Sequence, residues 1–302
     1  MSVKQRTLKS EFSLNGKGLH TGKQVTATFK PAEENFGYRI RRMDLEGSPE
    51  IPALAEYVKL MDRASCLEKD GVCVFTMEHA MAALYGCGID NCLIELSGEE
   101  FPILDGSAKY YVEEIEKVGF EEQKADRRYF TVKEQMEFCS EDGQTKITLL
   151  PDTDYNINLV VAYDSPYLQM QYATYSEKVT DFAKEIAPCR TFVFLRELEM
   201  LLQHNLIKGG DLDNAIVIVD REISQEEVNR LASEGMPFRD AYKKVGLDIE
   251  AGNFSHDKTV HHTHAGSIGN LCNDKIEELM QQVVSGFNFE KVVQAENSLL
   301  GR

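Results

Sequence analysis

The order of strand and helix signals repeats along residues 3–220, and this repetition constrains the fold more than any other feature. In the first half, apolar periodicity predicts strands at 9–14, 25–29, 37–40 and 91–96. It predicts helices at 77–84 and 110–118. In the second half, the strand patterns lie at 129–132, 146–150, 155–162 and 215–219, and a helical pattern lies at 195–202. Two similar domains, each a sheet backed by a helix pair, give an α+β architecture.

Changes in composition predict three regions. A charged stretch at 121–128 is expected to link a first domain at 1–122 to a second domain at 128–224. The second domain is expected to be incomplete, because strand signals stop after Val219. Residues 226–302 carry only helical patterns, which predicts a helical tail.

Composition limits the classes of function. The formal net charge of −17 argues against a nucleic-acid partner, because binding to phosphate backbones draws on Lys and Arg. It leaves room for a small anionic ligand in a locally basic cleft. No apolar run reaches the roughly 18 residues of a membrane span, and the N-terminus has no signal-peptide core. We therefore expect a cytoplasmic protein whose seven scattered cysteines are buried free thiols.

The dipeptide Glu78-His79 is a candidate catalytic site. Thr76 suits a helix N-cap, which would place both side chains in the first helical turn. An imidazole is a good zinc ligand, and an adjacent carboxylate can take a proton from a zinc-bound water. The alternative is a surface Glu and a half-buried His on an amphipathic helix.

Several separated motifs favour the catalytic alternative. Residues 3–220 closely resemble the UDP-3-O-acyl-N-acetylglucosamine deacetylases of lipid A synthesis. The motifs that carry the resemblance, in order, are Lys4-Gln5-Arg6-Thr7-Leu8-Lys9, Gly18-Leu19-His20-Thr21-Gly22, Thr76-Met77-Glu78-His79, Gly88-Ile89-Asp90-Asn91, Pro102-Ile103-Leu104-Asp105-Gly106-Ser107-Ala108, Arg190-Thr191-Phe192 and Gly209-Gly210-Asp211-Leu212-Asp213-Asn214.

The resemblance implies a zinc hydrolase that removes the N-acetyl group from an acylated UDP-amino-sugar, with its active site between two like-folded domains. Glu78 would be the general base, His79 a Zn²⁺ ligand, and Thr191 a stabiliser of the tetrahedral oxyanion. The remaining implied residues would bind substrate, at the sugar site or along a tunnel for the acyl chain: Phe192, Leu198 and Ile207. For the apolar residues, plain core packing is the alternative.

One departure from the family concerns the metal. The family takes its other two ligands from a His-x-x-x-Asp motif on a late helix, where one helical turn brings both side chains to one face. None of the histidines after Gly210 has an Asp four residues downstream, and no Gly-His pair follows. A catalytic zinc normally takes three protein ligands, so His79 alone leaves the site incomplete and turnover impaired.

The tail has a resemblance of its own. Residues 226–302 resemble the C-terminal end of argininosuccinate lyase, with a seam near 224–232. The segments that carry this resemblance are Gly235-Met236-Pro237-Phe238-Arg239-Asp240-Ala241-Tyr242, Gly246-Leu247-Asp248 and Val260-His261-His262-Thr263-His264. The lyase family's catalytic loop is absent, so lyase activity is not expected. His261 and His264 have a spacing that could chelate a metal if helical, although the lyase resemblance accounts for the cluster without metal.

Three hypotheses follow. The chain is an active zinc deacetylase whose tail or a second copy completes the metal site, or a non-catalytic hybrid that binds only nucleotide-sugar or acyl ligand. The third is a poorly folded fusion, in which exposed strand edges and apolar surface favour self-association.

Overall fold

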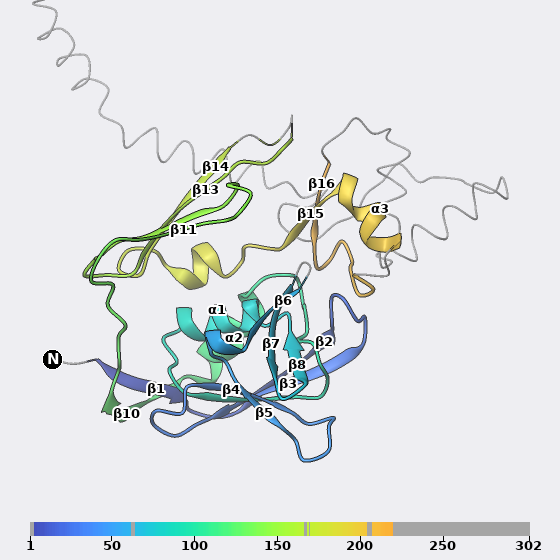
Figure 1. The fold of residues 1–302 in the computed structure, drawn as a ribbon. Coiled ribbons are helices and arrows are strands. Elements are labelled where there is room, and N and C mark those ends of the chain that lie inside the picture. The colour runs from blue at the N-terminus through green and yellow to red at the C-terminus, as the bar shows by residue number, and fades with distance from the viewer. Residues whose placement is uncertain (1–2, 62–63, 166–167, 169, 204–206, 220–302) are drawn as a thin grey trace, which may run out of the picture. The chain divides into compact units, whose positions relative to one another are not determined.

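The computed structural model describes residues 3–61, 64–165, 168, 170–203 and 207–219 (Figure 1). The predicted helical tail at 226–302 and its histidine cluster lie outside the described residues. Within the described part, the structure is a mixture of strands and helices, as the α+β prediction requires.

A five-stranded sheet organises the first half. Its order is β2 (Phe12–Lys17), β3 (Gln24–Pro31), β9 (Cys92–Leu96), β4 (Tyr38–Arg42) and β5 (Glu50–Pro52). Only the β4–β9 pair is parallel among these neighbours, with Ile40 opposite Ile94. Helices α1 (Glu78–Gly86) and α2 (Lys109–Val118) pack against each other beside this sheet (Figure 1).

The core of the first half follows from the alternation in β3. Val25, Ala27 and Phe29 point to the same side and are buried, as a period of two residues requires. The ring of Phe29 stacks on Phe12 with 4.7 Å between centroids and meets Tyr111 of α2 edge-on at 5.8 Å. These contacts join the sheet to α2, and aromatic pairs of this kind add to the burial energy.

A second, three-stranded sheet leads directly into α1. It consists of β6 (Val58–Met61), β7 (Ala64–Lys69) and β8 (Val72–Phe75), preceded by the short helix η1 (Ala55–Tyr57). The sequence patterns did not predict these strands, because residues 64–69 do not alternate between apolar and polar. Since β8 ends at Phe75, it delivers the chain to the Glu78-His79 dipeptide.

The stretch at 121–128, which is predicted to link the two halves, has regular structure over most of its length. Most of it forms β10 (Phe120–Asp126), which pairs antiparallel with β1 (Lys4–Leu8). Its charged side chains suit a strand that is largely exposed to solvent. The Lys4 ammonium lies 2.6 Å from the carboxylate of Asp126, and the Arg6 guanidinium lies 4.2 Å from the centre of the Phe120 ring.

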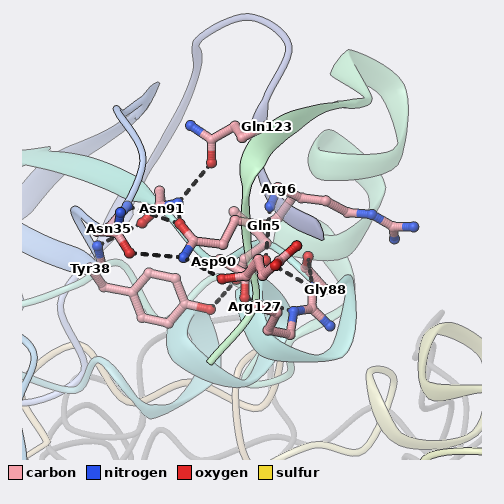
Figure 2. Close-up of polar contacts among 12 residues, drawn as sticks. Gln5, Arg6, Asn35, Tyr38, Gly88, Asp90, Asn91, Gln123 and Arg127 are labelled. Carbon is pink, nitrogen blue, oxygen red and sulfur yellow. Dashed lines mark hydrogen bonds and ion pairs between the residues drawn. The ribbon is translucent and has the colours of Figure 1, made fainter. Parts of the chain in front are cut away.

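A polar network ties this ribbon to the turn between α1 and β9 (Figure 2). The Asp90 carboxylate accepts a 2.8 Å hydrogen bond from the backbone N–H of Arg6 and pairs with two nitrogens of Arg127, each at 2.8 Å. Asn91 is buried, and its amide donates to the side-chain oxygen of Gln5 at 2.9 Å. The motif at 88–91 therefore anchors both β1 and the end of β10.

Replacing Asp90 by Asn is expected to lower the free energy of unfolding by about 1–3 kcal/mol, because the amide leaves a half-buried guanidinium or amide N–H without its acceptor. Glu114→Gln is the control, since Glu114 pairs with the exposed Lys117 and such pairs contribute less than about 1 kcal/mol. Urea unfolding checks both; equal losses in the two variants would contradict the anchoring role.

The described strands of the second half form three separate pairs. Antiparallel ribbons join β11 (Met136–Cys139) to β12 (Lys146–Leu149) and β13 (Asn156–Val161) to β14 (Gln171–Ser176). β15 (Phe192–Phe194) and β16 (Ile216–Ile218) are parallel. The single π-helical turn η2 (Phe182–Ile186) and α3 (Leu195–Gln203) complete the set, whereas residues 129–132, predicted as a strand, have no regular structure.

The two antiparallel ribbons expose apolar side chains. Phe138 and Leu159 are 59% and 51% exposed.

The six described cysteines are free thiols, as predicted, but only Cys66 and Cys92 are buried. The prediction of burial is wrong for Cys139 and Cys189, which are exposed; Cys139 lies on β11, where every residue is exposed.

Within the described residues, no helix has the length and apolarity needed to cross a membrane. The cytoplasmic location stays a prediction.

Candidate active site

Glu78 and His79 are the first two residues of α1, so both lie in its first turn as predicted. The predicted cap is wrong: the N-cap is Met77, with no side-chain capping bond, and Thr76 instead donates its hydroxyl to Glu100 at 3.1 Å. Thr76 has φ = 59°, which is a rare conformation for a β-branched residue. Strained backbone of this kind concentrates at functional sites.

The surroundings make Glu78 a stronger base and favour the uncharged form of His79. Desolvation raises the pKa of Glu78 above its usual range, and the negative charge of Glu100 adds to this. Desolvation lowers the pKa of His79, although the Asp105 carboxylate opposes the shift. A basic carboxylate can therefore stand beside an uncharged imidazole, which has a lone pair free for a metal.

The loop at 102–107 hydrogen-bonds the segment that contains Thr191 and acts electrostatically on His79. Asp105 acts electrostatically on His79, and its backbone carbonyl accepts a 2.7 Å hydrogen bond from Nε of Arg190. The next carbonyl, that of Gly106, accepts one from the backbone N–H of Thr191, also at 2.7 Å. One short loop thus hydrogen-bonds the segment of Thr191 and acts through the charge of Asp105 on His79, although the two predicted catalytic segments are more than 100 residues apart in sequence.

The predicted substrate residues have unequal environments. Phe192 is 41% exposed and meets Tyr163 edge-on at 5.7 Å. Leu198 and Ile207 are 1% and 8% exposed, and both belong to a buried apolar cluster against which Leu19 packs. Core packing therefore describes Leu198 and Ile207 in this conformation, and their contact with an acyl chain stays a prediction.

Sequence reasoning assigned no role to three residues of this region: Glu100, Asp105 and Arg190. Asp105 and Arg190 stand inside the motifs that carried the family resemblance, which was a signal that could have singled them out. Glu100 stands outside these motifs. Its burial at 2% exposure is visible only in the structure.

His79 is the predicted metal ligand among the described residues. Within residues 3–219 as described, no group of three or more His, Cys, Asp or Glu side chains could hold an ion. A hydrolytic zinc needs three such ligands. The donor set of the described part therefore does not by itself fit a catalytic zinc.

An α+β scaffold that presents a carboxylate and an imidazole in the first turn of a helix suits a hydrolase. The model of the family "LpxC: UDP-3-O-acyl N-acetylglycosamine deacetylase" matches residues 5–237. The chain belongs to this family.

Individual relatives agree with this assignment. A bifunctional enzyme LpxC/FabZ of Bacteroides thetaiotaomicron is 54% identical over 240 residues, which are 79% of this chain and 52% of the relative. The corresponding enzyme of Porphyromonas gingivalis is 51% identical, over 76% of this chain and 49% of its own length. The chain spans about half the length of these relatives. A UDP-3-O-acyl-N-acetylglucosamine deacetylase of Myxococcus xanthus is 37% identical over 97% of this chain and 90% of its own.

These comparisons give no support to a lyase-like segment. The family match continues to residue 237, past the predicted seam at 224–232. The alignment with the Myxococcus enzyme covers 97% of the chain and so runs through most of 226–302. The deacetylase relationship therefore extends into the range for which the lyase resemblance was predicted.

Proposed function

We propose that this chain catalyses, or takes part in, the hydrolytic removal of the N-acetyl group from an acylated UDP-N-acetylglucosamine in lipid A biosynthesis. The observation that carries the proposal is the Glu78-His79 dipeptide at the start of α1, joined through the 102–107 loop to Thr191. Membership of the deacetylase family supports the reaction class.

Each residue has a role in this proposal. Glu78 takes the proton from the attacking water, which its raised pKa favours. Thr191 donates to the oxyanion of the tetrahedral intermediate, held in place through its backbone bond to Gly106. Phe192 lines the sugar site, while Leu198 and Ile207 border the acyl chain after local rearrangement. His79 would bind Zn²⁺, which when present polarises the acetyl carbonyl and the water.

We also propose that turnover by this chain is lowered, since its sequence lacks a His-x-x-x-Asp pair after Gly210. This expectation rests on the sequence, because residues 220–302 lie outside the described part of the chain. A protein that binds nucleotide-sugar or acyl ligand without turnover is the second candidate, favoured by the same missing pair. Binding of UDP, measured by calorimetry, together with no release of acetate would identify it.

The two-domain organisation, with domains near 1–122 and 128–224, belongs to the same proposal. So does self-association, for which the exposed apolar side chains of β11 to β14 are the support.

Zinc content tests the proposed function. If the tail or a second copy completes the metal site, purified protein will hold about one zinc per chain and His79→Ala will lose it, because the site then lacks its imidazole ligand. No zinc in the unsubstituted protein would favour the binding-only candidate. Cys139→Ala is the control, since Cys139 is an exposed thiol that could hold adventitious zinc. The measurement is elemental analysis together with release of acetate from the acylated UDP-sugar.

Zinc that is indifferent to His79 would contradict the metal role of this residue. Zinc lost with His79 but no acetate release would leave the binding-only candidate.

A further inference from the structure

We propose that Glu100 is a positioning residue, whose buried carboxylate sets the start of α1 relative to the 18–22 loop and, through that loop, relative to Ile207. This inference rests on the proposed deacetylase function, because its catalytic readout requires turnover. Glu100 itself is not expected to touch the reacting atoms.

The Glu100 carboxylate accepts four hydrogen bonds. Oε1 accepts from the backbone N–H of His20 at 2.8 Å and from the hydroxyl of Thr76 at 3.1 Å. Oε2 accepts from the backbone N–H and the hydroxyl of Thr21, at 2.8 and 2.7 Å. All four donors are uncharged, so a side chain only 2% exposed is held by geometry rather than by a paired cation.

The Glu100 carboxylate occupies a space that the absence of a side chain at Gly18 leaves open. A Cβ atom on Gly18 would lie 2.2 Å from Oε2 of Glu100, so a side chain at this position would displace the carboxylate. On the other side, the hydroxyl of Thr76 is bound while its backbone has φ = 59°. The hydrogen bond to Glu100 helps to hold Thr76 in this conformation, two residues before Glu78.

The 18–22 loop links Glu100 to the segment beside the apolar cluster that contains Ile207. Its carbonyls at Leu19 and His20 accept hydrogen bonds from the N–H groups of Gly209 and Lys208, at 2.9 and 3.2 Å. A Cβ on Gly209 would lie 2.2 Å from the carbonyl oxygen of Gly18, so the two loops touch along their backbones. Ile207 immediately precedes this contact.

One carboxylate therefore touches the strand-to-helix turn that presents Glu78 and the loop that abuts Ile207. A small displacement of a general base costs rate, because proton transfer needs a short, aligned path. Loss of hydrogen bonds to the Glu100 carboxylate should then lower kcat more than it raises KM.

Matched substitutions separate this role from simple stability. Glu100→Gln replaces one carboxylate oxygen by an NH₂ group, and because both oxygens accept from a backbone N–H, one donor must lose its acceptor. Glu99→Gln is the same change at the neighbouring carboxylate, which pairs with Lys23 at the surface. Thr76→Val removes only the hydroxyl and keeps the branching, whereas Thr76→Ser keeps the hydroxyl.

We expect kcat to fall about tenfold in Glu100→Gln and Thr76→Val with KM changed less than about threefold, and to stay near wild type in Glu99→Gln and Thr76→Ser. The double variant Glu100→Gln/Thr76→Val should lose less than the product of the two single losses, because the substitutions share a hydrogen bond. Full additivity, or equal effects of Glu99→Gln and Glu100→Gln, would overturn the inference.

Hydrogen exchange gives a second readout that does not need turnover. In Glu100→Gln, amide exchange should become faster at residues 18–22 and 76–79, with no change in β13 and β14. Faster exchange in Glu100→Gln, together with no acetate release by the unsubstituted chain, would uphold the positioning role and reject the deacetylase function. Unchanged exchange at 18–22 and 76–79 would overturn the positioning role itself.

Discussion

Glu78→Gln is expected to lower kcat for acetate release by about 10²- to 10⁴-fold, because an amide of the same shape cannot take a proton from the attacking water. The side chain stands in the first turn of α1, and desolvation together with the charge of Glu100 raises its pKa. The environment thus strengthens Glu78 as a base, and the amide removes this basicity while keeping the size of the side chain.

The measurement is kcat and KM for the acylated UDP-sugar, with zinc content determined on the same samples. Because His79 is unchanged, zinc should remain, and a loss of rate without a loss of zinc assigns the effect to the proton transfer. Glu113→Gln provides the control, since Glu113 lies on α2 and pairs at 3.7 Å with the exposed Lys109. A loss of less than about tenfold in Glu78→Gln would show that another group accepts the proton.

The elements that could be predicted from sequence are those with clear periodicity. The alternation at 25–29 and 155–162 corresponds to β3 and β13, and the helical patterns at 77–84, 110–118 and 195–202 correspond to α1, α2 and α3. The strands β6 to β8 were not predicted because their apolar and polar residues do not alternate regularly. β10 was not predicted as a strand because its charged side chains face solvent, which gives the segment the composition of a linker.

The candidate site was predicted from motifs rather than from periodicity. The motifs supplied Glu78, His79 and Thr191, and the structure links their segments through the Asp105 and Gly106 carbonyls and the Asp105 charge. Glu100 could not be predicted in this way. Its role depends on donors at His20, Thr21 and Thr76, which are 80, 79 and 24 residues away in sequence. Such contacts exist only after the sheets have formed.

Gly106→Ala is expected to lower the free energy of unfolding by about 2–5 kcal/mol, because two unfavourable effects add at this position. Gly106 has φ = +81°, a conformation that residues with a Cβ rarely adopt. An added Cβ would also lie 2.0 Å from the carbonyl oxygen of Asn214 and 2.9 Å from its carbon, and a backbone group cannot rotate away as a side chain can. The loop at 104–107 would have to move from the 190–191 and 211–214 segments.

Gly37→Ala separates the two effects. Gly37 has φ = +71°, but a Cβ there would find no atom within 4 Å, so only the conformational cost of about 1–2 kcal/mol remains. Urea unfolding of both variants gives the difference that belongs to the contact with Asn214. Because Gly106 also accepts the hydrogen bond from Thr191, its variant should lose kcat as well, whereas Gly37→Ala should not. Equal destabilisation in the two variants would mean that the 104–107 loop moves away from Asn214 at little cost, and an unchanged kcat in Gly106→Ala would mean that its bond to Thr191 does not matter for turnover.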